Sequence, residues 1–179
     1  VLIGLPDASA TELTPIFVEG MASEEAGVRA ACASGLRVLR SKIGAAGPLL
    51  GAVIPAVREA AKKETSAGAL KAEYLALEYG EAGITASDPR AVLEAYVDIL
   101  DARAAQYAAN TPKADGADHV GIRAALAIKA QLDDAGRKKF AAAAARLLKF
   151  AVTRYAGGDH PLLKVKDDGP AALVAARDN

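Results

Sequence analysis

Residues 87–107 read SDPRAVLEAYVDILDARAAQY and decide the fold class. Asp88 can cap a helix that begins at Pro89, because an aspartate side chain accepts from free N–H groups and proline suits a first helical turn. The apolar residues that follow recur every three or four positions, which is the period of a helix with one buried face. They are Leu93, Tyr96, Val97, Leu100, Ala104 and Tyr107. This stretch therefore predicts a long amphipathic α-helix.

The same signals recur along the chain on both sides of this helix. They predict further helices at about 10–22, 24–43, 48–63, 67–81, 118–132, 134–155 and 171–177. In the helix at 24–43 we expect one buried stripe, formed by Val28, Cys32, Leu36, Leu39 and Ile43. Asp118 can cap the helix at 118–132, in which we expect Leu126 to be buried. No pair of strands is indicated, so the predicted class is all-α.

The composition supports this class and excludes several functions. Alanine makes up 44 of the 179 residues, and alanine is the best helix former. The 22 basic side chains balance the 22 acidic ones, which gives nucleic-acid binding no support from composition. Aromatic residues amount to 4%, without tryptophan, so a base-stacking surface has little material. The single cysteine, Cys32, cannot form an internal disulfide, which favours a reducing compartment such as the cytoplasm. No apolar run is long enough to span a membrane, so a soluble chain is expected.

A faint internal repeat runs through the chain. Val28-Arg29-Ala30-Ala31, Leu70-Lys71-Ala72-Glu73 and Ile122-Arg123-Ala124-Ala125 each place a basic residue between an apolar and a small one, near the start of a predicted helix. The segment Thr14-Pro15-Ile16-Phe17-Val18-Glu19 is echoed by Ile54-Pro55-Ala56-Val57-Arg58-Glu59 in the helix of the next pair. A pair of such amphipathic helices cannot bury its apolar faces alone, and it gains stability by stacking on neighbouring pairs.

With these motifs the chain resembles the HEAT-repeat family, whose units are antiparallel helix pairs with a proline in the first helix and an apolar-basic pair at the start of the second. The resemblance covers about residues 10–156. It implies a right-handed α-α superhelix, a solenoid of about three to four helical hairpins, in a single domain over 1–179 that we expect to be part of a longer chain. An up-down helical bundle is the alternative fold.

The residues that could carry chemistry favour structural roles. Cys32 lies on the apolar stripe, and the two histidines, His119 and His160, lack the spacing of a zinc site on a helix. Asp115, Asp118 and His119 could form a metal site, but capping and solvation are the more usual roles at the start of a helix. No catalytic motif is present. The sequence therefore predicts no catalytic residue, no metal and no cofactor.

Two sets of basic residues were candidate anion sites. Arg29, Lys71 and Arg123 would lie in register on successive second helices. Pairing with carboxylates in the turns, such as Glu25 and Asp118, is the favoured interpretation of this ladder. The triplet Arg137-Lys138-Lys139 is interpreted as a solvated helix face.

The predicted function is a non-catalytic scaffold or assembly module that binds a protein or peptide on the face formed by the second helices. The candidate binding residues are Arg37, Arg40, Glu73 and Lys129, and no nucleic acid is expected. The resemblance leaves two alternatives open: a HEAT-like enzyme, similar to bilin lyases or DNA glycosylases, and a structural spacer in a larger multidomain protein. The oligomeric state is left open.

Overall fold

The computed structural model describes residues 10–45, 47–79, 89–128 and 132–156, and its elements there are all helices. In chain order they are α1 (Ala10–Gly20), α2 (Ala26–Ala45), α3 (Gly47–Lys63), α4 (Ala67–Ala76), α5 (Arg90–Ala108), the short 3-10 helix η1 (Asp115–Ala117), α6 (Asp118–Ile128) and α7 (Asp134–Ala156). The all-α class is confirmed. The expected helix at 171–177 and the cap Asp88 lie outside the described residues.

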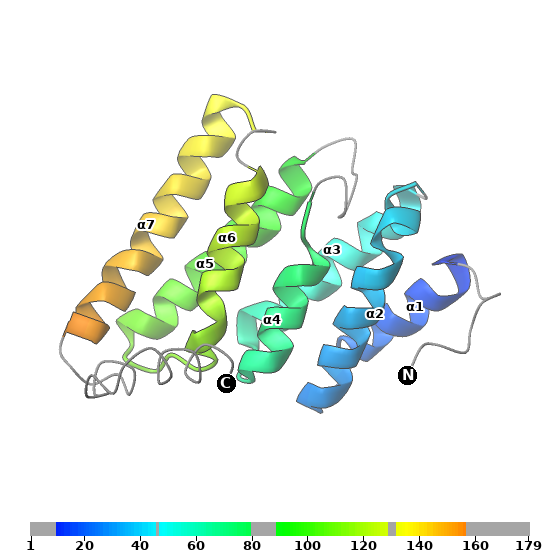
Figure 1. Ribbon diagram of the computed structural model, residues 1–179, viewed down its shortest axis with the longest axis horizontal. Helices are drawn as coiled ribbons and strands as arrows, with labels where there is room; N and C mark the ends of the chain where they lie inside the picture. Colours follow the sequence, from blue (N-terminus) through cyan, green and yellow to red (C-terminus); the bar gives the residue numbers. More distant parts are fainter. Residues whose placement is uncertain (1–9, 46, 80–88, 129–131, 157–179) are drawn as a thin grey trace, which may run out of the picture.

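The helices form two layers, which overlap in the view of Figure 1. The first-helix layer consists of α1, α3, α5 and α7, each packed on the next. The second-helix layer consists of α2, α4 and α6, again packed in chain order. Antiparallel contacts between α1 and α2, α3 and α4, and α5 and α6 join the layers into consecutive hairpins, and α1 and α7 lie at opposite ends of the array.

One continuous apolar core lies between the layers. It extends from Met21 and Leu36 at the α1–α2 end, through Tyr74 and Tyr96, to Leu147 of α7. Small residues allow close approach between helices: a Cβ at Gly121 of α6 would come within 2.4 Å of the Tyr74 ring. The apolar periodicity therefore located the core correctly for most of the chain.

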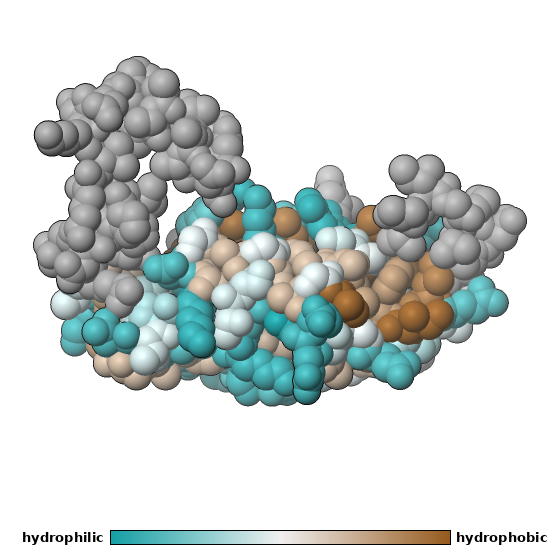
Figure 2. Space-filling view, turned by 90° about the horizontal axis from the view of Figure 1, so that it is seen from below, coloured by the Kyte–Doolittle hydropathy of each residue, from teal (hydrophilic) through white to brown (hydrophobic). Residues whose placement is uncertain are grey.

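Several predictions of detail are wrong. Val28 and Leu126 were expected in buried stripes, but both side chains are exposed, Leu126 by 50%. The helix expected at 67–81 ends at Ala76, where Leu77 forms the C-cap. Exposed apolar surface gathers at the end of the array formed by α1 and α2 (Figure 2), where Ile16 is 61% exposed. Within the described residues no further hairpin packs against this end of the array. Periodicity alone therefore overstated the burial of Val28 and Ile16.

Candidate binding face

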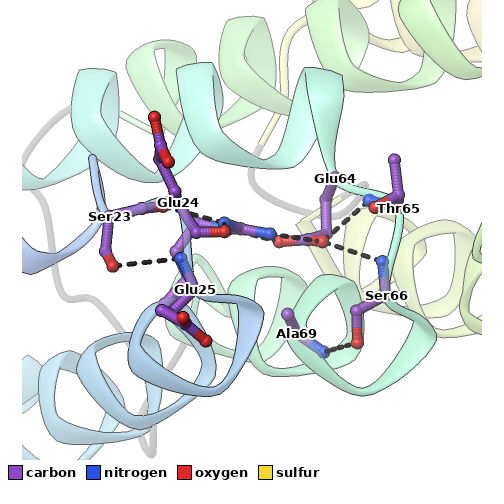
Figure 3. A network of polar contacts seen from close by, with 8 residues as sticks. Ser23, Glu24, Glu25, Glu64, Thr65, Ser66 and Ala69 are labelled. Carbon is purple, nitrogen blue, oxygen red and sulfur yellow. Dashed lines mark hydrogen bonds and ion pairs between the residues drawn. The ribbon is translucent and has the colours of Figure 1, made fainter.

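Arg29, at the start of α2, connects the turn of the first hairpin to the turn of the second. Its guanidinium donates to both carboxylate oxygens of Glu64, at 2.6 and 2.8 Å. The same group donates to the backbone carbonyls of Ser23 and Glu24, both at 2.8 Å. Figure 3 shows these contacts between the two turns. The interpretation of Arg29 as a structural residue is therefore correct, although its partner is Glu64 and not Glu25.

Glu64 also organises the start of α4. Its Oε1 accepts from the backbone N–H groups of Thr65 and Ser66, at 2.7 and 2.8 Å, and the Ser66 side chain caps α4 by accepting from Ala69 (Figure 3). Burial acts to raise the pKa of Glu64, but the hydrogen bonds from Arg29, Ser66 and Thr65 outweigh it and lower the pKa. Glu64 is thus held as a carboxylate that fixes two turns in place.

Glu73 does not lie on the surface where the sequence placed it. Its side chain, on α4, is 0% exposed, and neither carboxylate oxygen has a hydrogen-bond partner among the described residues. Burial, reinforced by the negative charge of Glu64 and only partly opposed by Arg29, raises the pKa of Glu73 to about 8. Glu73 is therefore predominantly protonated at neutral pH and takes no part in a solvent-facing binding surface.

A second buried ion pair joins α5 to the start of α6. The Arg103 guanidinium is fully buried and donates to both oxygens of Asp118, at 2.7 and 3.0 Å. Tyr107 donates its hydroxyl to the same carboxylate at 2.9 Å, and Gln106 accepts from Arg103. The expected pairing of Asp118 with Arg123 is wrong, because Asp118 points into the core while Arg123 is exposed. Sequence reasoning missed Arg103, although its position four residues before Tyr107 puts it on the apolar stripe.

The first-helix layer exposes side chains of both charges, and several of them pair with one another. Ion pairs join α3 to α5 and α5 to α7; they are Arg58–Asp98 at 3.4 Å, Lys139–Glu94 at 3.9 Å and Arg146–Asp101 at 2.6 Å. Arg137, from the basic triplet, pairs with Asp134 in the first turn of α7. Each such exposed pair contributes little stability. Lys63 and Lys138, which are also exposed on this layer, make no ion pair with a described residue.

The second-helix layer differs, because the described residues of its helices expose cations but no carboxylate. Helices α2, α4 and α6 contain two carboxylates, Glu73 and Asp118, and both are buried. Their exposed cations make no ion pair with any described residue; they are Arg37, Lys42, Lys71 and Arg123. Exposed or half-buried aliphatic side chains lie on the same helices: Val38 (72% exposed), Leu75 and Leu126. We call the solvent-facing side of α2, α4 and α6 the second-helix face.

The structure therefore places the candidate binding residues in different environments. Arg37 is exposed on the second-helix face. Arg40 is half-buried and is engaged with α4 and its C-terminal end, where it donates to the Leu75 carbonyl at 3.2 Å and to Glu78 at 2.9 Å. Glu73 is buried, and Lys129 lies outside the described residues. Lys71 and Arg123, considered only as parts of a structural ladder, are the exposed cations that complete the face.

The described residues hold no cluster of three or more histidine, cysteine or acidic side chains that could bind a metal ion. None of the helices in the same ranges is long and apolar enough to cross a membrane. In comparisons with known proteins, no family model, no curated protein and no solved structure matches this chain.

Proposed function

We propose that this chain is a short HEAT-like α-solenoid, a right-handed superhelix of hairpins that acts as a non-catalytic scaffold. It binds a protein or peptide along the second-helix face. The solenoid is supported by the order of packing, because each hairpin rests on the next one along the chain. In a closed up-down bundle the first and last helices would be neighbours, whereas α1 and α7 lie at opposite ends in Figure 1.

One observation carries the binding proposal: the uneven distribution of exposed charges between the two layers. The first-helix layer exposes both carboxylates and cations, and some of them pair with one another, as in Arg58–Asp98, Lys139–Glu94 and Arg146–Asp101. The second-helix layer leaves its exposed cations without carboxylates and places aliphatic side chains next to them. Charged and apolar side chains that are exposed together on one face are typical of a surface that meets a partner.

The buried polar contacts support a preformed face. The Arg29–Glu64 pair fixes two successive hairpins through their turns. Within the third hairpin, the Arg103–Asp118 pair fixes α5 against α6. A face that is rigid before binding loses little conformational entropy when the partner arrives, which favours affinity.

Site-specific photo-crosslinking tests this proposal with the full chain in lysate of its source organism. A photoreactive residue replaces Ser34 of α2 or Ala127 of α6, both exposed on second helices. Matched controls carry it at Ala105 of α5 and Ala142 of α7, which are exposed on first helices. We expect one and the same protein to be crosslinked from the first two positions and not from the controls. Crosslinks from the control positions alone, or none above background anywhere, would contradict binding at this face and would favour a spacer.

A further inference from the structure

We infer that the second-helix face takes an acidic peptide segment in which aliphatic residues lie between the carboxylates. The inference rests on the proposed function and names the chemistry of its partner. It is carried by a repeated pairing, since each second helix contributes at least one exposed cation and at least one accessible aliphatic side chain. The pairs are Arg37 with Val38, Lys71 with Leu75, and Arg123 with Leu126.

The cations on this face are available to an external carboxylate. Among the described residues Arg37, Lys71 and Arg123 have no ion pair, and the carboxylates of their own helices are buried away from solvent. Glu78, a half-buried acid just after the end of α4, is engaged by Arg40. An acidic partner can therefore pair with the three cations without breaking an internal contact, and the positive field attracts it from solution.

Contacts between the helices set the relative levels of the three cations along the helix axes. Arg40 reaches across to Leu75 and Glu78, which sets Arg37 near the level of Glu73. Gly121 lies against Tyr74, which sets Arg123 near the level of Ala76. Lys71 is five residues before Ala76 in the sequence, a rise of about 7.5 Å in a helix. The three cations thus form an uneven row across the second helices, in which Lys71 is offset from both Arg37 and Arg123 toward the N-terminal ends of the helices.

The spacing of this row fits an extended peptide. Packed helices lie about 8–10 Å apart, and an extended chain advances about 3.3 Å per residue. Carboxylates at about every third residue would therefore meet Arg37, Lys71 and Arg123 in turn. Aliphatic residues between them would reach Val38, Leu75 and Leu126, which lie one to four residues after the cations on the same helices.

The same row does not fit a nucleic acid. Binding of single strands combines a basic groove with aromatic side chains on which the bases stack. Helices α2, α4 and α6 contain no phenylalanine or tryptophan, and their one tyrosine, Tyr74, is buried. Exposed aliphatic side chains between cations add nothing to phosphate binding, but they bury apolar surface against a peptide.

The test measures binding of labelled synthetic peptides by fluorescence anisotropy at low salt. The first peptide has about nine residues, with glutamate at every third position and leucine or valine between. The second replaces each glutamate by glutamine, and a single-stranded oligonucleotide serves as a polyanion of another class. We expect the acidic peptide to bind at least about tenfold more tightly than the glutamine peptide, and to weaken as salt screens the charges. Equal affinity for the two peptides, or tighter binding of the oligonucleotide, would overturn the inference.

A charge-reversal variant locates the binding. The variant R37E/K71E/R123E is compared with K63E/K113E/K138E, which reverses three exposed lysines elsewhere and changes the net charge equally. All six side chains are exposed, so circular dichroism should show both variants folded. We expect the first variant to lose at least about tenfold in affinity for the acidic peptide and the second to lose little. Equal losses would overturn the assignment to this face. Failure of the parent chain to bind any acidic peptide, while crosslinks from Ser34 and Ala127 persist, would overturn the inference and leave the proposed function standing.

Discussion

Replacement of the buried Glu73 by glutamine should change how stability depends on pH. Glu73 is 0% exposed, and its carboxylate oxygens have no hydrogen-bond partner among the described residues. Burial, reinforced by the charge of Glu64, raises its pKa from 4.5 to about 8, and Arg29 only partly opposes this. Glu73→Gln keeps the shape of the side chain and removes its titration.

The direction of this pH dependence follows from whether Glu73 carries a proton in the folded and in the unfolded chain. Below about pH 4.5 Glu73 is protonated both folded and unfolded, so it has no pH-dependent effect. Between pH 4.5 and about 8 the unfolded chain releases this proton while the folded chain retains it, so the free energy of unfolding falls as pH rises. Above pH 8 both states are ionised and the loss levels off. Since one pKa unit corresponds to about 1.4 kcal/mol, the full effect is ~5 kcal/mol.

Urea unfolding, followed by far-UV circular dichroism between pH 5 and pH 8, measures this effect. The free energy of unfolding of Glu73→Gln minus that of the parent chain should rise by several kcal/mol across this range. Glu19→Gln, at an exposed position on α1, is the matched control and should show a nearly constant difference. A difference for Glu73→Gln that stays constant with pH would show that Glu73 is not a buried, protonated carboxyl in the folded chain.

Two further changes test the packing of the layers by urea unfolding. Asp118→Asn should lower the free energy of unfolding by about 3–5 kcal/mol, because it leaves the buried Arg103 guanidinium without its counter-charge. A loss below about 1 kcal/mol, which is typical of a solvent-exposed ion pair, would contradict the burial of this pair. Gly121→Ala should destabilise by about 1–3 kcal/mol, because the added Cβ would approach the Tyr74 ring to 2.4 Å. Gly51→Ala, with nothing within 4 Å, should instead stabilise α3 by about 0.5–1 kcal/mol, and equal effects at the two glycines would contradict the close contact of α4 with α6.

Much of the helix arrangement could be predicted from the sequence because its signals are local. The cap signal at Asp88 and the three-to-four periodicity up to Tyr107 predicted α5, Arg90–Ala108, within a residue or two. The end of α4 was misplaced by several residues, because helix termination depends on packing as well as on turn-forming residues.

Burial of charged residues was harder to predict, because it depends on segments distant in the chain. Glu73 lies three residues after Leu70 and four before Leu77, so its spacing puts it on the buried stripe. Charge alone suggested a surface position. Arg103 likewise lies four residues before the buried Tyr107, so its spacing also puts it on a buried stripe. The carboxylates that lie near Glu73 and Arg103 are Glu64 and Asp118, which belong to other turns, and only the folded chain brings these groups together.

The candidate face could be predicted in part. The hypothesis that the second helices form this face came from the repeat pattern, and Arg37 was a candidate because it lies off the apolar stripe of its helix. Sequence alone could not show that Arg40 is engaged by Glu78 or that Lys71 and Arg123 are free among the described residues. Pairing of surface charges between adjacent helices depends on their lateral register, which no local pattern specifies.

Amide chemical-shift mapping by NMR tests most directly where the molecule meets its partner. The full chain, labelled with ¹⁵N, is titrated with the acidic aliphatic peptide. The largest shifts should cluster on solvent-facing residues of α2, α4 and α6 around Arg37, Lys71 and Arg123, with α1, α3, α5 and α7 nearly unchanged. Shifts that cluster on the first-helix layer, or that are absent at saturating peptide, would contradict recognition through the second-helix face.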